Sequence, residues 1–186
     1  MLELEQKPVQ GTLLIAHPVI RDPNFRRTVV LLCEHNEDGT YGLVLNRPTP
    51  IQLNEVVENP AIQSPLFIGG PVQPNTLHIL HRIGSRIDGS KAIRDGICWG
   101  GDLDDIAEVL NGAHAAPQDV RFYVGYSGWG EGQLDEEIER GGWLLMTASN
   151  ELIFNHPPED LWRVTMRNMG GEYALVSTYP DDSSCN

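Results

Sequence analysis

The sequence predicts a single domain, residues 1–186, of the α+β or mixed α/β class. Short apolar segments of strand length recur along the chain, and segments with helical spacing lie between them. The 19 glycines and 13 prolines are spread throughout, which is typical of many short elements joined by tight turns. With 186 residues, 40% hydrophobic and 21% charged, the chain has the size and composition of one globular domain. We expect loosely ordered tails at residues 1–10 and 176–186.

Strands are predicted where β-branched, aliphatic and aromatic residues are concentrated over a few positions. The predicted strands cover residues 12–16, 28–34, 42–46, 66–68, 76–81, 97–99, 120–126, 143–147 and 151–154. The second and third flank Asp38-Gly39, which supplies a positive-φ turn, so we expect them to form a hairpin. Several of these strands are apolar at every position, which predicts that both faces of the sheet are covered.

The sequence predicts three clear helices and a fourth, weaker one. In the first, Asp102 is a capping residue, and Leu103, Ile106 and Leu110 fall on one face. The second carries apolar residues one turn apart among acids, and the third begins with two prolines and stops at Gly170-Gly171. The four helices are expected at residues 103–111, 132–140, 157–169 and 53–58.

The net charge of −13 excludes one large class of partner. Acidic residues are concentrated between Gly101 and Glu139, where ten carboxylates accompany one basic residue, Arg121. Such a surface repels phosphate backbones, so we expect no direct nucleic-acid binding. The ordinary interpretation is a solvated surface, and the alternative is an acidic docking face for a basic partner.

The N-terminus lacks the basic and apolar segments of a secretory signal, and the longest apolar run, residues 29–33, is too short to span a membrane. We therefore expect a cytoplasmic protein with no membrane partner. The three cysteines, Cys33, Cys98 and Cys185, include no pair at CxxC spacing, so neither a disulfide framework nor a zinc site is predicted. The histidines are scattered as well, and we expect no metal and no cofactor.

Three turns combine glycine or proline with polar groups and form the candidate ligand or partner surface. They are Asn46-Arg47-Pro48, Gly69-Gly70-Pro71, and residues 125–134 with Ser127, Trp129 and Gln133. A nucleophile elbow around Ser127 is ruled out, because Trp129 stands where the motif requires a glycine. Each turn follows a predicted strand. If those strands run the same way, the turns meet at one depression; otherwise they are three unrelated turns.

No acid/base, nucleophile or metal-ligand set can be assembled from the sequence. The leading interpretation is therefore a non-enzymatic binding or regulatory protein that acts through a protein or small-ligand partner. The alternative is an enzyme or sensor that binds a small anionic metabolite, with Asn46, Arg47 and Gln133 positioning the ligand. For Arg47, pairing within the protein is the simpler interpretation, since its guanidinium suits both uses.

Several long motifs resemble the YqgE/AlgH family in unbroken order from about Gly11 to Gly170. They lie at residues 11–18, 22–32, 42–48, 69–72, 125–134, 137–138 and 142–143. The resemblance implies a bacterial, cytoplasmic protein with a closed or bifurcated mixed β-structure surrounded by about four helices. It supplies no catalytic residues, and family members often have alanine at the position of Ser127. Some members are labelled transcriptional regulators, but a pI of about 4.7 and the lack of a helix-turn-helix pattern favour action without direct DNA contact.

Overall fold

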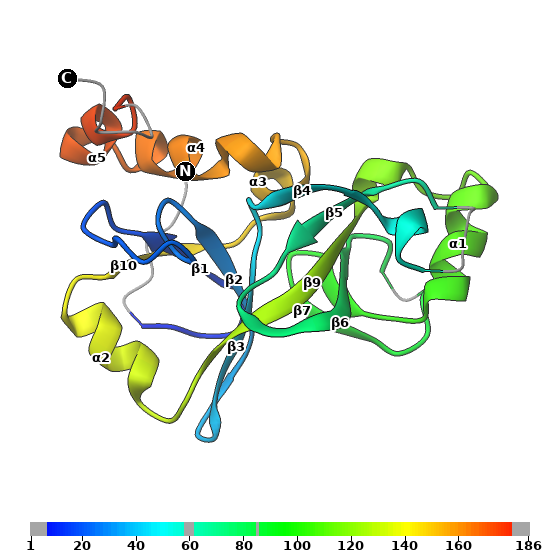
Figure 1. The fold of residues 1–186 in the computed structure, drawn as a ribbon, viewed down its shortest axis with the longest axis horizontal. Coiled ribbons are helices and arrows are strands. Elements are labelled where there is room, and N and C mark those ends of the chain that lie inside the picture. The colour runs from blue at the N-terminus through cyan, green and yellow to red at the C-terminus, as the bar shows by residue number, and fades with distance from the viewer. Residues whose placement is uncertain (1–6, 58–61, 85, 180–186) are drawn as a thin grey trace.

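The computed structural model describes residues 7–57, 62–84 and 86–179 and has a mixed α+β fold (Figure 1). Within these residues, ten strands form one curled sheet. The strands are β1 (Thr12–Ala16), β2 (Val29–Asn36), β3 (Gly39–Val44), β4 (Pro48–Gln52), β5 (Pro65–Ile68), β6 (Val72–His81), β7 (Ser90–Arg94), β8 (Ile97–Gly100), β9 (Val120–Trp129) and β10 (Trp143–Thr147).

The sheet branches at β9. The C-terminal half of this strand pairs antiparallel with β3, through Gly42 opposite Ser127. Its N-terminal half pairs parallel with β5, through Phe67 opposite Tyr123, and its other edge pairs with β6. The path β10-β1-β2-β3-β9-β6-β8-β7 is open, with β10 and β7 at its ends. The expected alternative of a closed β-structure is therefore wrong, because no pairing joins those two end strands in the described chain.

The five α-helices of the described chain are one more than the expected four. They are α1 (Leu103–Asn111), α2 (Gln133–Glu139), α3 (Asn150–Phe154), α4 (Leu161–Met169) and α5 (Gly171–Val176). The predicted strand at 151–154 is α3, because the Ser149 hydroxyl accepts a hydrogen bond from the Leu152 amide at 3.2 Å and caps a helix there. The weak helix expected at 53–58 is a 3-10 turn over Leu53–Glu55, and residue 58 lies outside the described residues.

Both faces of the β1–β2 region are covered, as the uniformly apolar strands predict. Leu13 and Ile15 of β1 face one apolar cluster, which α3 and α4 complete. Leu14 and Ala16 face a second cluster, which α2 covers from the other side (Figure 1). A third cluster lies at the far end of the sheet, between β6, β9 and α1. The turn that joins β2 to β3 is the expected hairpin, with Asn36 opposite Gly39.

The residues at the borders of the predicted tails make defined contacts. Gln10 donates a hydrogen bond to the Cys33 carbonyl at 3.0 Å, and the Tyr179 carbonyl accepts one from Arg27 at 2.9 Å. Residues 1–6 and 180–186 lie outside the described residues. In the part of the chain that is described, no helix has the length and apolarity of a bilayer-spanning segment.

Candidate functional site

A cleft of about 640 Å³ lies beside the end of β3 and the start of α4. Four arginines line it, in a protein with only 13 basic residues and a net charge of −13. Two acidic residues, Glu159 and Asp160, also line it, so arginines outnumber acids among the described residues of its lining. We call this the arginine cleft. Its lining residues are Pro23, Arg26, Arg27, Asn46, Arg47, Glu159, Asp160, Trp162 and Arg163.

Asn46 fixes the floor of the cleft. Its side chain is 5% exposed, and its amide oxygen accepts a hydrogen bond from the Val29 backbone at 2.9 Å. Its amide nitrogen donates to the Arg27 carbonyl, also at 2.9 Å. A buried asparagine thus extends the β2–β3 pairing by one residue, and it positions the backbone that carries two of the arginines.

Arg27 has a left-handed backbone with φ of 54°, which costs a non-glycine residue about 1–2 kcal/mol. Three contacts hold this conformation. Asn46 binds the Arg27 carbonyl, the guanidinium lies 4.9 Å from the centre of the Trp162 ring, and a guanidinium N–H donates to the Tyr179 carbonyl. Strained backbone of this kind is concentrated at ligand-binding sites. Here it turns the chain so that Arg26 and Arg27 line the same cleft.

Arg47 and Arg163 complete the set from different elements. The Arg47 guanidinium donates a hydrogen bond to the Arg26 carbonyl, and the Arg47 carbonyl accepts one from Ile68 at 2.8 Å. Arg163 is an exposed residue in the first turn of α4. The next residue toward the N-terminus, Trp162, is buried and donates its indole N–H to the Ala16 carbonyl at 2.8 Å. That bond fixes α4, and with it Arg163, against β1.

Gly69, Gly70, Pro71 and Ser127 lie next to the end of β3. The Gly69 carbonyl accepts hydrogen bonds from the Val44 amide at 2.8 Å and from the Ser127 hydroxyl at 3.2 Å. Ser127 is fully buried, so its hydroxyl has a structural role. A side chain at Gly70 would place its Cβ 2.2 Å from the Tyr126 carbonyl carbon, so only glycine fits. Gly70 and Pro71, together with Arg47, border a small recess beside the arginine cleft.

Trp129 and Gln133 lie elsewhere. Trp129 is buried against Phe25 and Trp143, and its indole donates to a Glu137 carboxylate oxygen at 3.0 Å. Gln133 accepts from the Gly130 amide and donates to Glu137, both at 3.1 Å. We expected the three turns to meet if their strands run the same way; β5 and β9 are parallel, whereas β3 and β9 are antiparallel. Pro48 begins β4 and is exposed.

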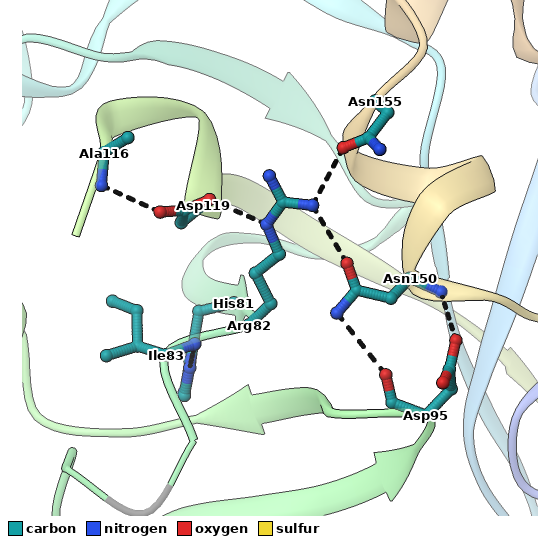
Figure 2. A network of polar contacts seen from close by, with 8 residues as sticks. All are labelled: His81, Arg82, Ile83, Asp95, Ala116, Asp119, Asn150 and Asn155. Carbon is teal, nitrogen blue, oxygen red and sulfur yellow. Dashed lines mark hydrogen bonds and ion pairs between the residues drawn. The ribbon is translucent and has the colours of Figure 1, made fainter.

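A second polar cluster, around Arg82, is made of side chains that bind one another (Figure 2). The Arg82 guanidinium donates to Asp119 at 2.7 Å, to Asn150 at 2.9 Å and to Asn155 at 2.8 Å. The Asn150 backbone amide in turn donates a hydrogen bond to the Asp95 carboxylate at 2.8 Å. These contacts join α3 to the start of β9 and to the β7–β8 turn, which is a structural role.

The titratable groups whose pKa burial shifts lie outside the arginine cleft. Burial raises the pKa of the Cys33 and Cys98 thiols and of the Tyr41 and Tyr123 hydroxyls, that of Tyr123 to about 12. Burial lowers the pKa of the imidazoles of His78 and His81. Among the described residues, no three His, Cys, Asp or Glu side chains lie close enough together to hold a metal ion. The cleft therefore offers fixed positive charge and hydrogen-bond donors, which suit the binding of an oxyanion.

Residues 13–174 match the sequence model of the AlgH-like family. The chain belongs to this family. A UPF0301 protein of Chlorobium limicola is 44% identical over 172 residues, which cover 92% of each chain. The solution structure of AlgH from Pseudomonas aeruginosa is similar with a TM-score of 0.74 and 30% identity, over 98% of this chain and 100% of that one. A crystal structure from Corynebacterium diphtheriae has a TM-score of 0.80 and 25% identity, over 94% of both chains.

The family predicted from the motifs is thus confirmed, but the sequence pointed to only part of the cleft of this AlgH-like chain. Asn46 and Arg47 were among the predicted residues, whereas Arg26, Arg27 and Arg163 were not. One signal was available, since adjacent arginines are conspicuous in a chain with 13 basic residues. Arg163 gave no such signal, because only the packing of α4 on β1 brings it to Arg47.

Proposed function

We propose that this AlgH-like protein is a non-enzymatic binding protein with a regulatory role, and that its arginine cleft takes the anionic group of a small ligand. One observation carries the proposal: four arginines line one cleft of a strongly acidic protein. Guanidinium groups form paired, charge-assisted hydrogen bonds with carboxylates and phosphates. A volume of about 640 Å³ lies within the range of small-molecule sites.

The chemistry of the lining favours binding over catalysis. Arginine stays protonated at any pH at which proteins fold, so its guanidinium does not serve as a general acid or base. Glu159 and Asp160 are exposed at the cleft, as surface carboxylates are. The alternative of an enzyme acting on the same anionic metabolite would depend on one of these two carboxylates. Cytoplasmic location and a role without direct DNA contact stay predictions.

Thermal unfolding in the presence of inorganic phosphate tests the proposal. We expect phosphate to raise the melting temperature of the wild type more than that of the double variant Arg26→Gln/Arg163→Gln. A ligand at 100 times its Kd adds about 2.7 kcal/mol of stability. The matched control is Arg140→Gln, an exposed arginine on the C-terminal side of α2.

The control matters because phosphate also stabilises proteins by exclusion from their surfaces. That general effect is the same in all three proteins, so only the difference between them reports on the cleft. Equal shifts in the wild type and the double variant would rule out anion binding at the arginine cleft. Turnover of a phosphorylated or carboxylated substrate that is lost in Glu159→Gln would instead establish the enzymatic alternative.

A further inference from the structure

A small recess of about 100 Å³ opens beside the arginine cleft, and the two share Pro23 and Arg47. Its other walls are largely apolar, with Val44, Ile68 and Pro71 among them. Val44 is 1% exposed and therefore lies at the bottom of the recess. A charged cleft and a largely apolar recess thus adjoin at Arg47, which lines both.

Ile68 gives the recess its exposed apolar surface. The residue is 46% exposed, although large aliphatic side chains are usually buried. Its backbone amide donates a hydrogen bond to the Arg47 carbonyl at 2.8 Å, which fixes the two residues side by side. A ligand group that covers Ile68 would remove apolar surface from water, and that transfer is favourable.

The recess is formed before any ligand arrives. Val44, at its bottom, is tied to Gly69 by a backbone hydrogen bond of 2.8 Å. Gly70, in its wall, is pressed against the Tyr126 backbone with no room for a side chain. Walls that are already rigid lose little conformational entropy on binding, which favours affinity.

From this juxtaposition we infer that the ligand of the arginine cleft is amphipathic, with an oxyanion head and a short aliphatic chain. The head binds the guanidinium groups, and the chain passes Arg47 and occupies the recess against Ile68 and Val44. Arg47 contacts both parts, because its methylene stem is apolar and its end is charged. The inference rests on the proposed function, since the head must bind in the cleft for the chain to reach the recess.

The test is a calorimetric titration with a homologous series of phosphates. Inorganic phosphate, methyl phosphate, butyl phosphate and hexyl phosphate share a head and differ in chain length. We expect affinity to rise about three- to fourfold for each added methylene up to butyl. Beyond butyl it levels off, since a recess of about 100 Å³ is filled by then. Acetate and butyrate form a second arm, which tells whether the preferred head is a phosphate or a carboxylate.

Ile68→Asn is the informative variant, because it makes the recess polar and leaves the arginines in place. We expect it to abolish the gain with chain length while inorganic phosphate binds as to the wild type. The matched control is Ile51→Asn, since Ile51 on β4 is 40% exposed and does not line the recess. It keeps the full gain with chain length.

The outcomes separate the two ideas. If neither inorganic phosphate nor acetate binds, or if both bind the Arg26→Gln/Arg163→Gln variant as well as the wild type, the proposed function is wrong and the inference with it. If phosphate binds but every alkyl phosphate binds with the same affinity, only the amphipathic ligand is overturned. A gain with chain length that persists in Ile68→Asn overturns the recess as its location.

Discussion

Asn46 connects strand pairing to the arginine cleft through one side chain. Beyond the end of β3, its side-chain amide takes the place of a backbone partner: the oxygen accepts from the Val29 amide and the nitrogen donates to the Arg27 carbonyl. The Arg27 carbonyl that it binds belongs to the left-handed residue at the cleft. An aliphatic side chain at this position would leave the Val29 amide and the Arg27 carbonyl without partners.

We therefore predict that Asn46→Ala lowers the free energy of unfolding by about 1–3 kcal/mol, the cost of leaving buried polar groups unsatisfied. Urea titration monitored by circular dichroism measures the change. Phosphate affinity falls as well, because the Arg26-Arg27 turn loses its anchor. Asn168→Ala, at an exposed position of α4, is the control and has little effect. Equal stability of the two variants would contradict a structural role for Asn46.

His81 is a buried histidine whose ring is fixed on both sides. One ring nitrogen accepts a hydrogen bond from the Ile83 amide at 3.3 Å, and the other lies 2.8 Å from the Ser90 hydroxyl. Burial lowers the pKa of His81 below its ordinary value of 6.5, and a backbone hydrogen bond with Gly100 partly opposes this. The unfolded chain therefore binds the proton more readily than the folded protein.

It follows that the contribution of His81 to stability is complete above pH 6.5 and is lost as the pH falls below that value. We predict that the free energy of unfolding decreases from pH 7.5 to pH 5.5 more steeply in the wild type than in His81→Gln. Urea titrations at the two pH values measure this change in the free energy of unfolding. The control is His114→Gln, since His114 is exposed. Identical slopes in wild type and His81→Gln would show that the imidazole keeps its ordinary pKa.

At the scale of elements, the Arg82 cluster attaches a short helix to the sheet (Figure 2). Helix α3 has five residues, which is too few for an isolated helix to be stable, so its tertiary contacts hold it. Arg82 and Asp119 are each about one-fifth exposed, and their ion pair is shielded from water more than a surface pair would be. The Phe154 ring, 5.3 Å from the guanidinium, covers it further.

We predict that Arg82→Gln costs about 2 kcal/mol of stability, in line with hydrogen bonds to charged groups. Hydrogen exchange at the amides of α3 accelerates, because that helix loses its attachment. The comparison is Arg140→Gln, whose pair with Glu136 is 74% and 65% exposed and contributes under about 0.5 kcal/mol. Unchanged exchange in α3 would show that the packing of Phe154 alone holds the helix.

The sequence predicted elements well where local signals and packing agree. β1 and β10 begin and end at the predicted residues, and the Asp102 cap starts α1 through bonds to the Asp104 and Asp105 amides. The prediction was wrong at 151–154, where strand-forming residues are overruled by the Ser149 cap. β4 and β7 were missed because each is a short, mostly exposed strand without an apolar pattern. In the arginine cleft, only Asn46 and Arg47 could be predicted, because they follow the end of a predicted strand.

At the scale of the whole molecule, the strand β9 contributes residues to all three apolar clusters. β9 places Tyr123 in the first apolar cluster and Trp129 in the second. It also places Phe122 in the third cluster, together with Ile106 of α1. Each of the three apolar clusters of the described residues therefore contains residues of β9.

We predict one cooperative unfolding transition. Ile106→Ala in the third cluster costs about 2–5 kcal/mol. It shifts the midpoint seen by tryptophan fluorescence, although the four tryptophans lie in or against the first and second clusters. Leu175→Ala, at a position 60% exposed, is the control with little effect. If Ile106→Ala unfolds α1 while the tryptophan signal keeps its midpoint, the chain contains two independently stable parts.

The position of β9 also limits how such a chain can change in length over evolution. A residue inserted into β9 would reverse the facing of every side chain beyond it, and it would do so against β3, β5 and β6 at once. The hairpin at Glu37 and Asp38 carries no comparable constraint, since both residues are exposed between paired strands. Insertions and deletions should therefore accumulate at the β2–β3 turn, whereas β9 should change only by substitution.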